Sequence, residues 1–164
     1  MATITTNRYT VTLKQAAALI AACPENRYFL RGEPGIGKSS IIKMLMATTG
    51  YLGAYLDVPN MDLGDISMPV IDHENRITRY YPNGRFKLHE GKPVIIMLDE
   101  FTKAADPVKN MLHPLLEVHN PRLGDVPLPK GSIVFLTGNL DSDGVGDTLQ
   151  AHTQMRITEL EIAK

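Results

Sequence analysis

One glycine-rich stretch holds the residues best suited to chemistry, in the order Gly32-Glu33-Pro34-Gly35-Ile36-Gly37-Lys38-Ser39. It fits the pattern G-x-x-x-x-G-K-[ST] at every position. Glycines let the backbone curl so that successive N–H groups point inward, as a cluster of phosphate oxygens requires. Lys38 would add a positive charge, and the Ser39 hydroxyl would complete the coordination shell of Mg²⁺. The stretch, with Ser40 after it, is therefore predicted to bind a nucleoside triphosphate. A glycine turn that merely precedes a helix is the less favoured alternative.

The sequence around this phosphate loop (residues 32–39) places it between a strand and a helix. Residues 28–30 are an apolar run, and residues 41–46 are apolar on one helical face, with Gly50 placed to end the helix. The free N–H groups and the positive dipole end of that helix would face the phosphates. The residues that would hold the base are less evident, and residues 9–12 are the candidate region.

A second group of candidate residues follows the apolar run at residues 93–98, which is typical of a buried parallel strand. Asp99 would hold Mg²⁺ through the ion's hydration shell, and Glu100 would polarise the attacking water. Two acidic residues after a strand are weak evidence alone, because many strands simply exit into a loop this way. The phosphate loop upstream favours the catalytic interpretation. The adjacent pair also argues against a nucleotide kinase, which passes phosphate to a bound acceptor.

Two further residues are candidates for catalysis, each with a plain alternative. Asn139 follows the next predicted strand, where its amide could hold the water against the γ-phosphate. Gly138-Asn139 is also an ordinary turn sequence. Arg156 is the only arginine after Arg122 and lies just before the last predicted strand. Its alternative is a solvated surface charge.

The rest of the chain supplies the elements that must position these residues. Strands are predicted at residues 28–31, 54–58, 93–98, 133–136 and 157–162. A capping box at residues 12–15 predicts one helix start, and Asp106 is predicted as the N-cap of another, with Pro107 at its first position. Pro114 should bend or shorten that helix, and a short helix is expected at residues 147–155. Alternating strands and helices predict an α/β fold, a three-layer αβα sandwich around a five-stranded parallel sheet.

Two segments do not fit the alternation of strands and helices. Residues 59–92 form a long insertion, in which residues 70–71 and 76–80 are predicted to pair as a small hairpin. A long insertion in a compact domain usually has a function. Residues 119–131 hold three prolines and two glycines and are predicted to form a loop or a tight hairpin.

Composition limits the classes of function. A chain of 164 residues suggests one domain. The net charge of −1 provides no basic field for nucleic acid. The single cysteine excludes an internal disulfide and suits a reducing, cytoplasmic environment. No apolar stretch approaches the roughly 20 residues that span a bilayer, so no membrane association is expected.

These motifs, in this order, resemble those of the AAA+ ATPases, and specifically of the MoxR-like group. The phosphate loop matches the family's Walker A motif, and residues 98–104 are similar to its Walker B motif. Residues 123–129 and 137–139 resemble its approach to sensor 1, and residues 65–69 with the predicted hairpin resemble the group's insertion. Arg156 falls where the family carries its arginine finger. The resemblance covers most of residues 28–162.

The resemblance implies strand order 5-1-4-3-2, with ATP and Mg²⁺ as ligands. It also implies a hexameric ring in which Arg156 acts on a neighbour's ATP, and in which hydrolysis remodels an unidentified client protein. The family normally continues into a helical lid with a sensor 2 arginine, whereas this sequence ends at Lys164 as the large nucleotide-binding subdomain alone. We therefore expect weak ATP hydrolysis. The alternatives are a nucleotide-gated assembly module with little hydrolysis and, less favoured, a P-loop kinase.

Overall fold

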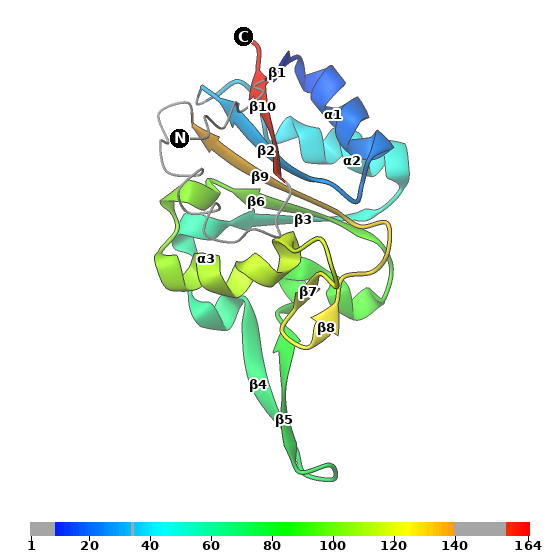
Figure 1. The fold of residues 1–164 in the computed structure, drawn as a ribbon, viewed down its shortest axis with the longest axis vertical. Helices are drawn as coiled ribbons and strands as arrows, with labels where there is room; N and C mark the ends of the chain where they lie inside the picture. The colour runs from blue at the N-terminus through cyan, green and yellow to red at the C-terminus, as the bar shows by residue number, and fades with distance from the viewer. Residues whose placement is uncertain (1–8, 34, 140–156) are drawn as a thin grey trace, which may run out of the picture.

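The computed structural model describes residues 9–33, 35–139 and 157–164 (Figure 1). A parallel sheet forms the centre, in the order β1-β10-β2-β9-β6-β3. Its strands are β1 (Tyr9–Val11), β2 (Arg27–Gly32), β3 (Leu52–Asp57), β6 (Val94–Asp99), β9 (Ile133–Asn139) and β10 (Ile157–Ile162). The five predicted strands are all present, and their order is the expected 5-1-4-3-2. The predicted α/β fold class is therefore confirmed.

The expected count of five strands is wrong, because β1 adds a sixth at the edge of the sheet. Tyr9 pairs with Leu160 and Val11 with Ile162, so β1 lies parallel to β10. A strand of three residues is too short to show the alternation that predicts longer strands. Its partner is also at the other end of the chain, where no local pattern could indicate the pairing.

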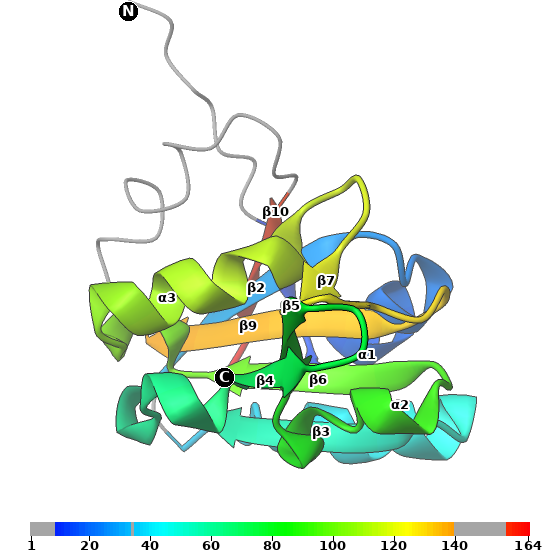
Figure 2. The same ribbon diagram turned by 90° about the horizontal axis from the view of Figure 1, so that it is seen from below.

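The helices cover both faces of the sheet and make the three predicted layers. Helices α1 (Leu13–Ala22) and α2 (Ser40–Thr49) lie together on one face, and α3 (Asp106–Leu112) lies on the other (Figure 1). Each face has its own buried core. Ile20 and Leu45 pack with Phe135 on the first face, and Leu112 packs with Leu136 on the second. Figure 2 shows the same arrangement from below.

The helix ends follow the sequence signals, with one correction. The capping box at Thr12 makes both of its hydrogen bonds, and Gly50 ends α2 in the left-handed conformation, φ 73°. Asp106 is the first helical residue rather than the N-cap, which is Ala105. The N–H groups of the first helical turn have no partner within the helix, and proline has no N–H. Pro107 therefore fits the second helical position as well as the first. The predicted effect of Pro114 is confirmed, because α3 ends at Leu112 and a 3₁₀ turn, His113–Leu116, follows.

The insertion contains the predicted hairpin, longer than expected. Strands β4 (Ser67–Asp72) and β5 (Ile77–Pro82) pair antiparallel and project from the body of the molecule (Figure 1). Four 3₁₀ turns flank them: Val58–Asn60, Leu63–Asp65, Gly84–Phe86 and Leu88–Glu90. Fully buried Ile66 and Phe86 anchor the base of the hairpin in the α3-side core. Beyond that base, six large apolar side chains are exposed: Met68, Val70, Ile71, Ile77, Tyr80 and Tyr81.

A second, short hairpin is joined to the first. It consists of β7 (Arg122–Leu123) and β8 (Val126–Pro127), so the predicted tight hairpin is confirmed. The N–H of Asp125 donates to the carbonyl of Tyr80 at 2.9 Å, and the N–H of Tyr80 donates to the Asp125 carboxylate at 2.6 Å. Gly124 lies so close that a Cβ there would be 2.6 Å from the Tyr80 oxygen. The turn of one hairpin is thus tied to the strand of the other.

Candidate nucleotide site

The phosphate loop connects β2 to α2 as the sequence predicted. Gly35 and Gly37 both have a left-handed backbone, with φ 84° and 87°, which residues other than glycine rarely adopt. Apart from the adjoining residues, no described atom lies within 4 Å of where a Cβ at Gly35 would be, so the loop is open there. The Ser40 hydroxyl donates to the Gly37 carbonyl at 2.6 Å and so stabilises the turn into the helix. Pro34, also predicted for this site, lies outside the described residues.

Lys38 lies across the carboxyl ends of two neighbouring strands. Its Nζ donates to the carbonyl of Gly32 at 3.0 Å and to that of Gly138 at 2.8 Å, and contacts Asn139 Oδ1 at 3.4 Å. Burial lowers the pKa of Lys38, while the charges of Asp99 and Glu100 oppose this shift. Three acceptors match the three N–H bonds of the ammonium group. A phosphate oxygen would therefore replace existing partners rather than fill an unsatisfied position.

Asp99 ends β6, and two hydroxyl groups hold its carboxylate from the flanking strands. Thr137 on β9 donates to Oδ1 at 2.5 Å, and Tyr55 on β3 donates to Oδ2. The hydrogen bond to Asp99, followed by burial, raises the pKa of Tyr55. Thr137 in turn accepts from the N–H of Glu100 at 3.0 Å. The metal candidate and the water-activating candidate are therefore linked through one buried threonine.

Glu100 has an unusual backbone. Its φ of 51° places a non-glycine residue in the left-handed region, a conformation that clusters at functional sites. The bond to Thr137 and the buried ring of Phe101, which begins the 3₁₀ turn Phe101–Lys103, hold it there. The Glu100 side chain is 41% exposed, and Lys103 Nζ lies 3.5 Å from its Oε1. The carboxylate is thus accessible to water but already has one cationic neighbour.

The structure brings most of the predicted site residues together at the carboxyl ends of the central strands β2, β9 and β6. Asn139 pairs in register with Gly32 and contacts Lys38, so the sensor candidate adjoins the phosphate loop. Ser39 is exposed at the N-cap of α2. Arg156 lies outside the described residues, so its predicted role stays a prediction.

Sequence reasoning missed Tyr55 and Thr137. Thr137 belongs to the stretch 137–139 that resembles sensor 1, but the sequence predicted no role for it, because its hydrogen bond to Asp99 depends on β9 lying beside β6. Tyr55 fits a strand by its residue type alone, and its contact with Asp99 depends on β3 lying beside β6. For the base, residues 9–12 stay a prediction. Leu13, just after them, would lie 3.6 Å from a Cβ at Gly37, so this segment does approach the loop.

These residues fit a triphosphate with Mg²⁺. The loop, open at Gly35, and the ammonium group of Lys38 suit phosphate oxygens, and the Ser39 hydroxyl and Asp99 carboxylate are hard oxygen ligands. Among the described residues, no group of three or more His, Cys, Asp or Glu could hold a metal alone. Mg²⁺ usually takes one or two protein ligands together with phosphate oxygens and water.

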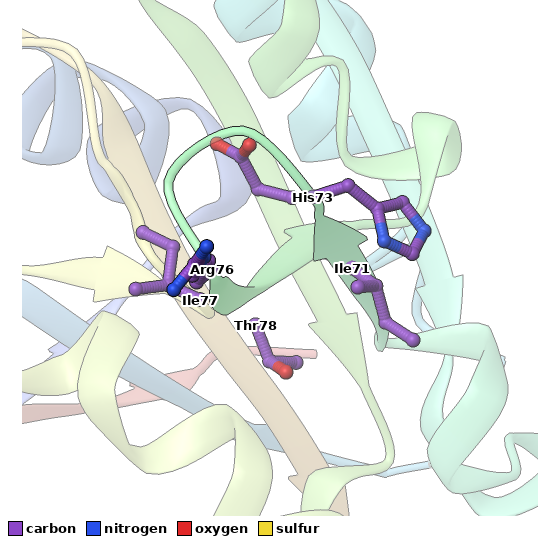
Figure 3. A pocket seen from close by; sticks show the side chains of 6 residues that line it. Ile71, His73, Arg76, Ile77 and Thr78 are labelled. Carbon is purple, nitrogen blue, oxygen red and sulfur yellow. The ribbon is translucent and has the colours of Figure 1, made fainter.

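A separate pocket lies on the β4–β5 hairpin (Figure 3), which projects from the body of the molecule (Figure 1). Its volume is about 330 Å³, and its lining includes Ile71, Asp72, His73, Arg76, Ile77 and Thr78. Asp72 is engaged in the local turn, accepting hydrogen bonds from Glu74 and Asn75. The pocket is therefore a feature of the hairpin turn and takes no part in the nucleotide site.

Comparison with known proteins agrees with this geometry. Residues 28–155 match the family model described as "ATPase family associated with various cellular activities (AAA)". A crystal structure of "a putative ATPase" from Cytophaga hutchinsonii has a similar fold, with a TM-score of 0.56 at 14% sequence identity. The match covers 92% of this chain but 46% of that one, so this chain spans about half its length. No match was found among curated proteins. Within the described part of the chain, no helix is long and apolar enough to cross a membrane.

Proposed function

We propose that this chain, which belongs to the AAA family of ATPases, binds ATP with Mg²⁺ at the phosphate loop and hydrolyses it. One observation carries the proposal. Lys38 of the loop meets Asp99 and Asn139, which come from the carboxyl ends of β6 and β9. Ligands of open α/β sheets bind at the carboxyl ends of the strands, where this meeting point lies.

Each residue has a distinct role in binding. The N–H groups of the loop and of the first turn of α2 would donate to the phosphates. Lys38 would move from the Gly32 and Gly138 carbonyls to the terminal phosphates, and Ser39 and Asp99 would hold Mg²⁺. The ion would neutralise charge on the phosphate oxygens.

Hydrolysis would depend on Glu100 and Asn139. Glu100 is partly exposed and would accept a proton from the attacking water, while the Asn139 amide would orient that water. For this, Glu100 would turn from Lys103 toward the nucleotide. An exposed ion pair of this kind holds weakly, by about 0.2–1 kcal/mol, so the exchange is not costly.

Work on a partner protein is the second part of the proposal. We assign the chain to the MoxR-like group, with a ring assembly and an Arg156 finger acting between subunits. The exposed apolar side chains of the β4–β5 hairpin support contact with another protein.

One observation favours the alternative of a nucleotide-gated assembly module. Lys103 contacts the carboxylate of Glu100, so the proposed base is engaged by a cation. If that contact persisted with ATP bound, the chain would bind nucleotide but turn it over slowly. Comparison of ATP affinity with the rate of phosphate release separates the two functions.

The test of ATP binding at this loop is Lys38→Ala, with Lys43→Ala as the matched control. Lys43 is exposed on α2, the helix that follows the loop, and lies outside the site. Loss of a charge-assisted contact to phosphate should cost roughly 1.5–3 kcal/mol, or about ten- to a hundred-fold in ATP affinity. Calorimetry should show this loss for Lys38→Ala alone. Equal affinity in both variants would refute the assignment of the loop.

A further inference from the structure

We infer that Tyr55 is a positioning residue for the metal, because its hydroxyl holds the Asp99 carboxylate in the orientation that receives Mg²⁺. The inference rests on the proposed function and extends it to a residue on a neighbouring strand. It starts from the hydrogen bond between the Tyr55 hydroxyl and Asp99 Oδ2.

The strand register explains how Tyr55 reaches Asp99. Tyr55 lies opposite Met97 and therefore shares a sheet face with Asp99, two residues further along β6. A diagonal neighbour at this offset is within reach of a long aromatic side chain. The contact is therefore built from the pairing of two regular strands and not from a loop.

The packing of α2 places Tyr55 beside the phosphate loop. Gly53, the preceding residue on the same face, lies directly under α2, since a Cβ there would be 2.6 Å from the Met46 sulfur and 3.2 Å from Ile42. From Met46 toward its N-terminus, α2 leads to the phosphate loop. From Gly53 to Tyr55, β3 extends in the same direction. Tyr55 therefore lies on the α2 face of the sheet, toward the phosphate end.

The two hydroxyls hold the carboxylate from both sides. Thr137 on β9 donates to Oδ1 and Tyr55 on β3 donates to Oδ2, so each strand beside β6 contributes one donor. A carboxylate has about four lone-pair positions, so positions remain for the water molecules that surround Mg²⁺. A carboxylate held at both oxygens would not have to be ordered when the metal binds.

The exposure of Tyr55 argues that this contact is more than packing. Tyr55 is 50% exposed, whereas the neighbouring strand residues Ala54 and Leu56 are 2% exposed. Its ring adds little to the core, so replacement by phenylalanine should leave the fold intact. What the replacement removes is one hydroxyl, and with it one of the two donors to Asp99.

The expected effect of Tyr55→Phe is a loss of metal affinity at an unchanged nucleotide site. Groups that orient a metal ligand typically contribute about 10- to 100-fold in metal affinity. We therefore expect Mn²⁺, a paramagnetic substitute for Mg²⁺, to bind the ATP complex of Tyr55→Phe about tenfold more weakly. Binding of ATP in the presence of EDTA should match that of the wild-type protein.

The experiment is a Mn²⁺ titration of each ATP-saturated protein, followed by electron paramagnetic resonance, with metal-free ATP binding measured by calorimetry. Tyr51→Phe is the matched control, because Tyr51 precedes β3 at the opposite end and lies near Gly131. A loss of Mn²⁺ affinity in Tyr55→Phe alone, at unchanged metal-free ATP affinity, supports the inference.

Two results would overturn it. One is wild-type Mn²⁺ affinity in Tyr55→Phe. The other is a parallel loss of metal-free ATP binding, which would show a structural effect on the whole site. Failure of the proposed function would look different, because the wild-type protein would then bind neither ATP nor Mn²⁺–ATP.

Discussion

At the scale of single residues, Thr137 connects the two acidic residues of the site. It is fully buried, donates to Asp99 and accepts from the N–H of Glu100. The sequence predicted both acidic residues because they follow a long apolar strand. It could not predict the role of Thr137, since a threonine at a strand end is ordinary and its partners are 37 and 38 residues away.

Replacement of Thr137 by valine should destabilise the protein. Valine keeps the shape but removes the Thr137 hydroxyl from the Glu100 N–H and from Asp99 Oδ1, at a cost of about 1–3 kcal/mol. Thr102→Val is the control, because the buried Thr102 Oγ1 has no hydrogen-bond partner among the described residues and its loss should be neutral or stabilising. Urea unfolding of both variants measures the difference. Equal stabilities would show that the Thr137 bonds contribute nothing net.

At the scale of elements, local patterns predicted what local physics determines. The five long strands, the capping box at Thr12, the stop at Gly50 and the break at Pro114 follow from periodicity and backbone chemistry. Strand β1 was missed because three residues carry no period and its pairing comes from β10. The contact between the two hairpins was missed because it joins Tyr80 to Asp125, 45 residues further along the chain, and no local pattern indicates it.

That contact predicts a difference between two glycines. Gly124 has φ 57° and its Cβ would meet the Tyr80 carbonyl at 2.6 Å, whereas Gly91 has φ 66° with no described atom within 4 Å. Gly91→Ala should cost only the left-handed backbone strain, about 1–2 kcal/mol. Gly124→Ala should cost more, because the hairpins must also separate. Thermal unfolding gives the comparison, and equal losses would mean that the hairpins do not depend on their close approach.

At the scale of the whole molecule, the sheet order converts scattered residues into one site. Residues 38, 99 and 139 are remote in sequence, and the order β2-β9-β6 brings their strand ends together. The ordered motifs made this convergence predictable. Arg156 lies outside the described residues, and its trans role, the ring and the client stay proposals.

The central claim, ATP hydrolysis by Glu100 at a separately built binding site, is tested most directly by single-turnover phosphate release from ATP bound to Glu100→Gln. Glu90→Gln, on an exposed turn, is the control. Loss of a positioned base should slow release by about 10²- to 10⁴-fold while ATP affinity is unchanged. Release from Glu100→Gln at the rate of the wild-type protein and of Glu90→Gln would contradict the account.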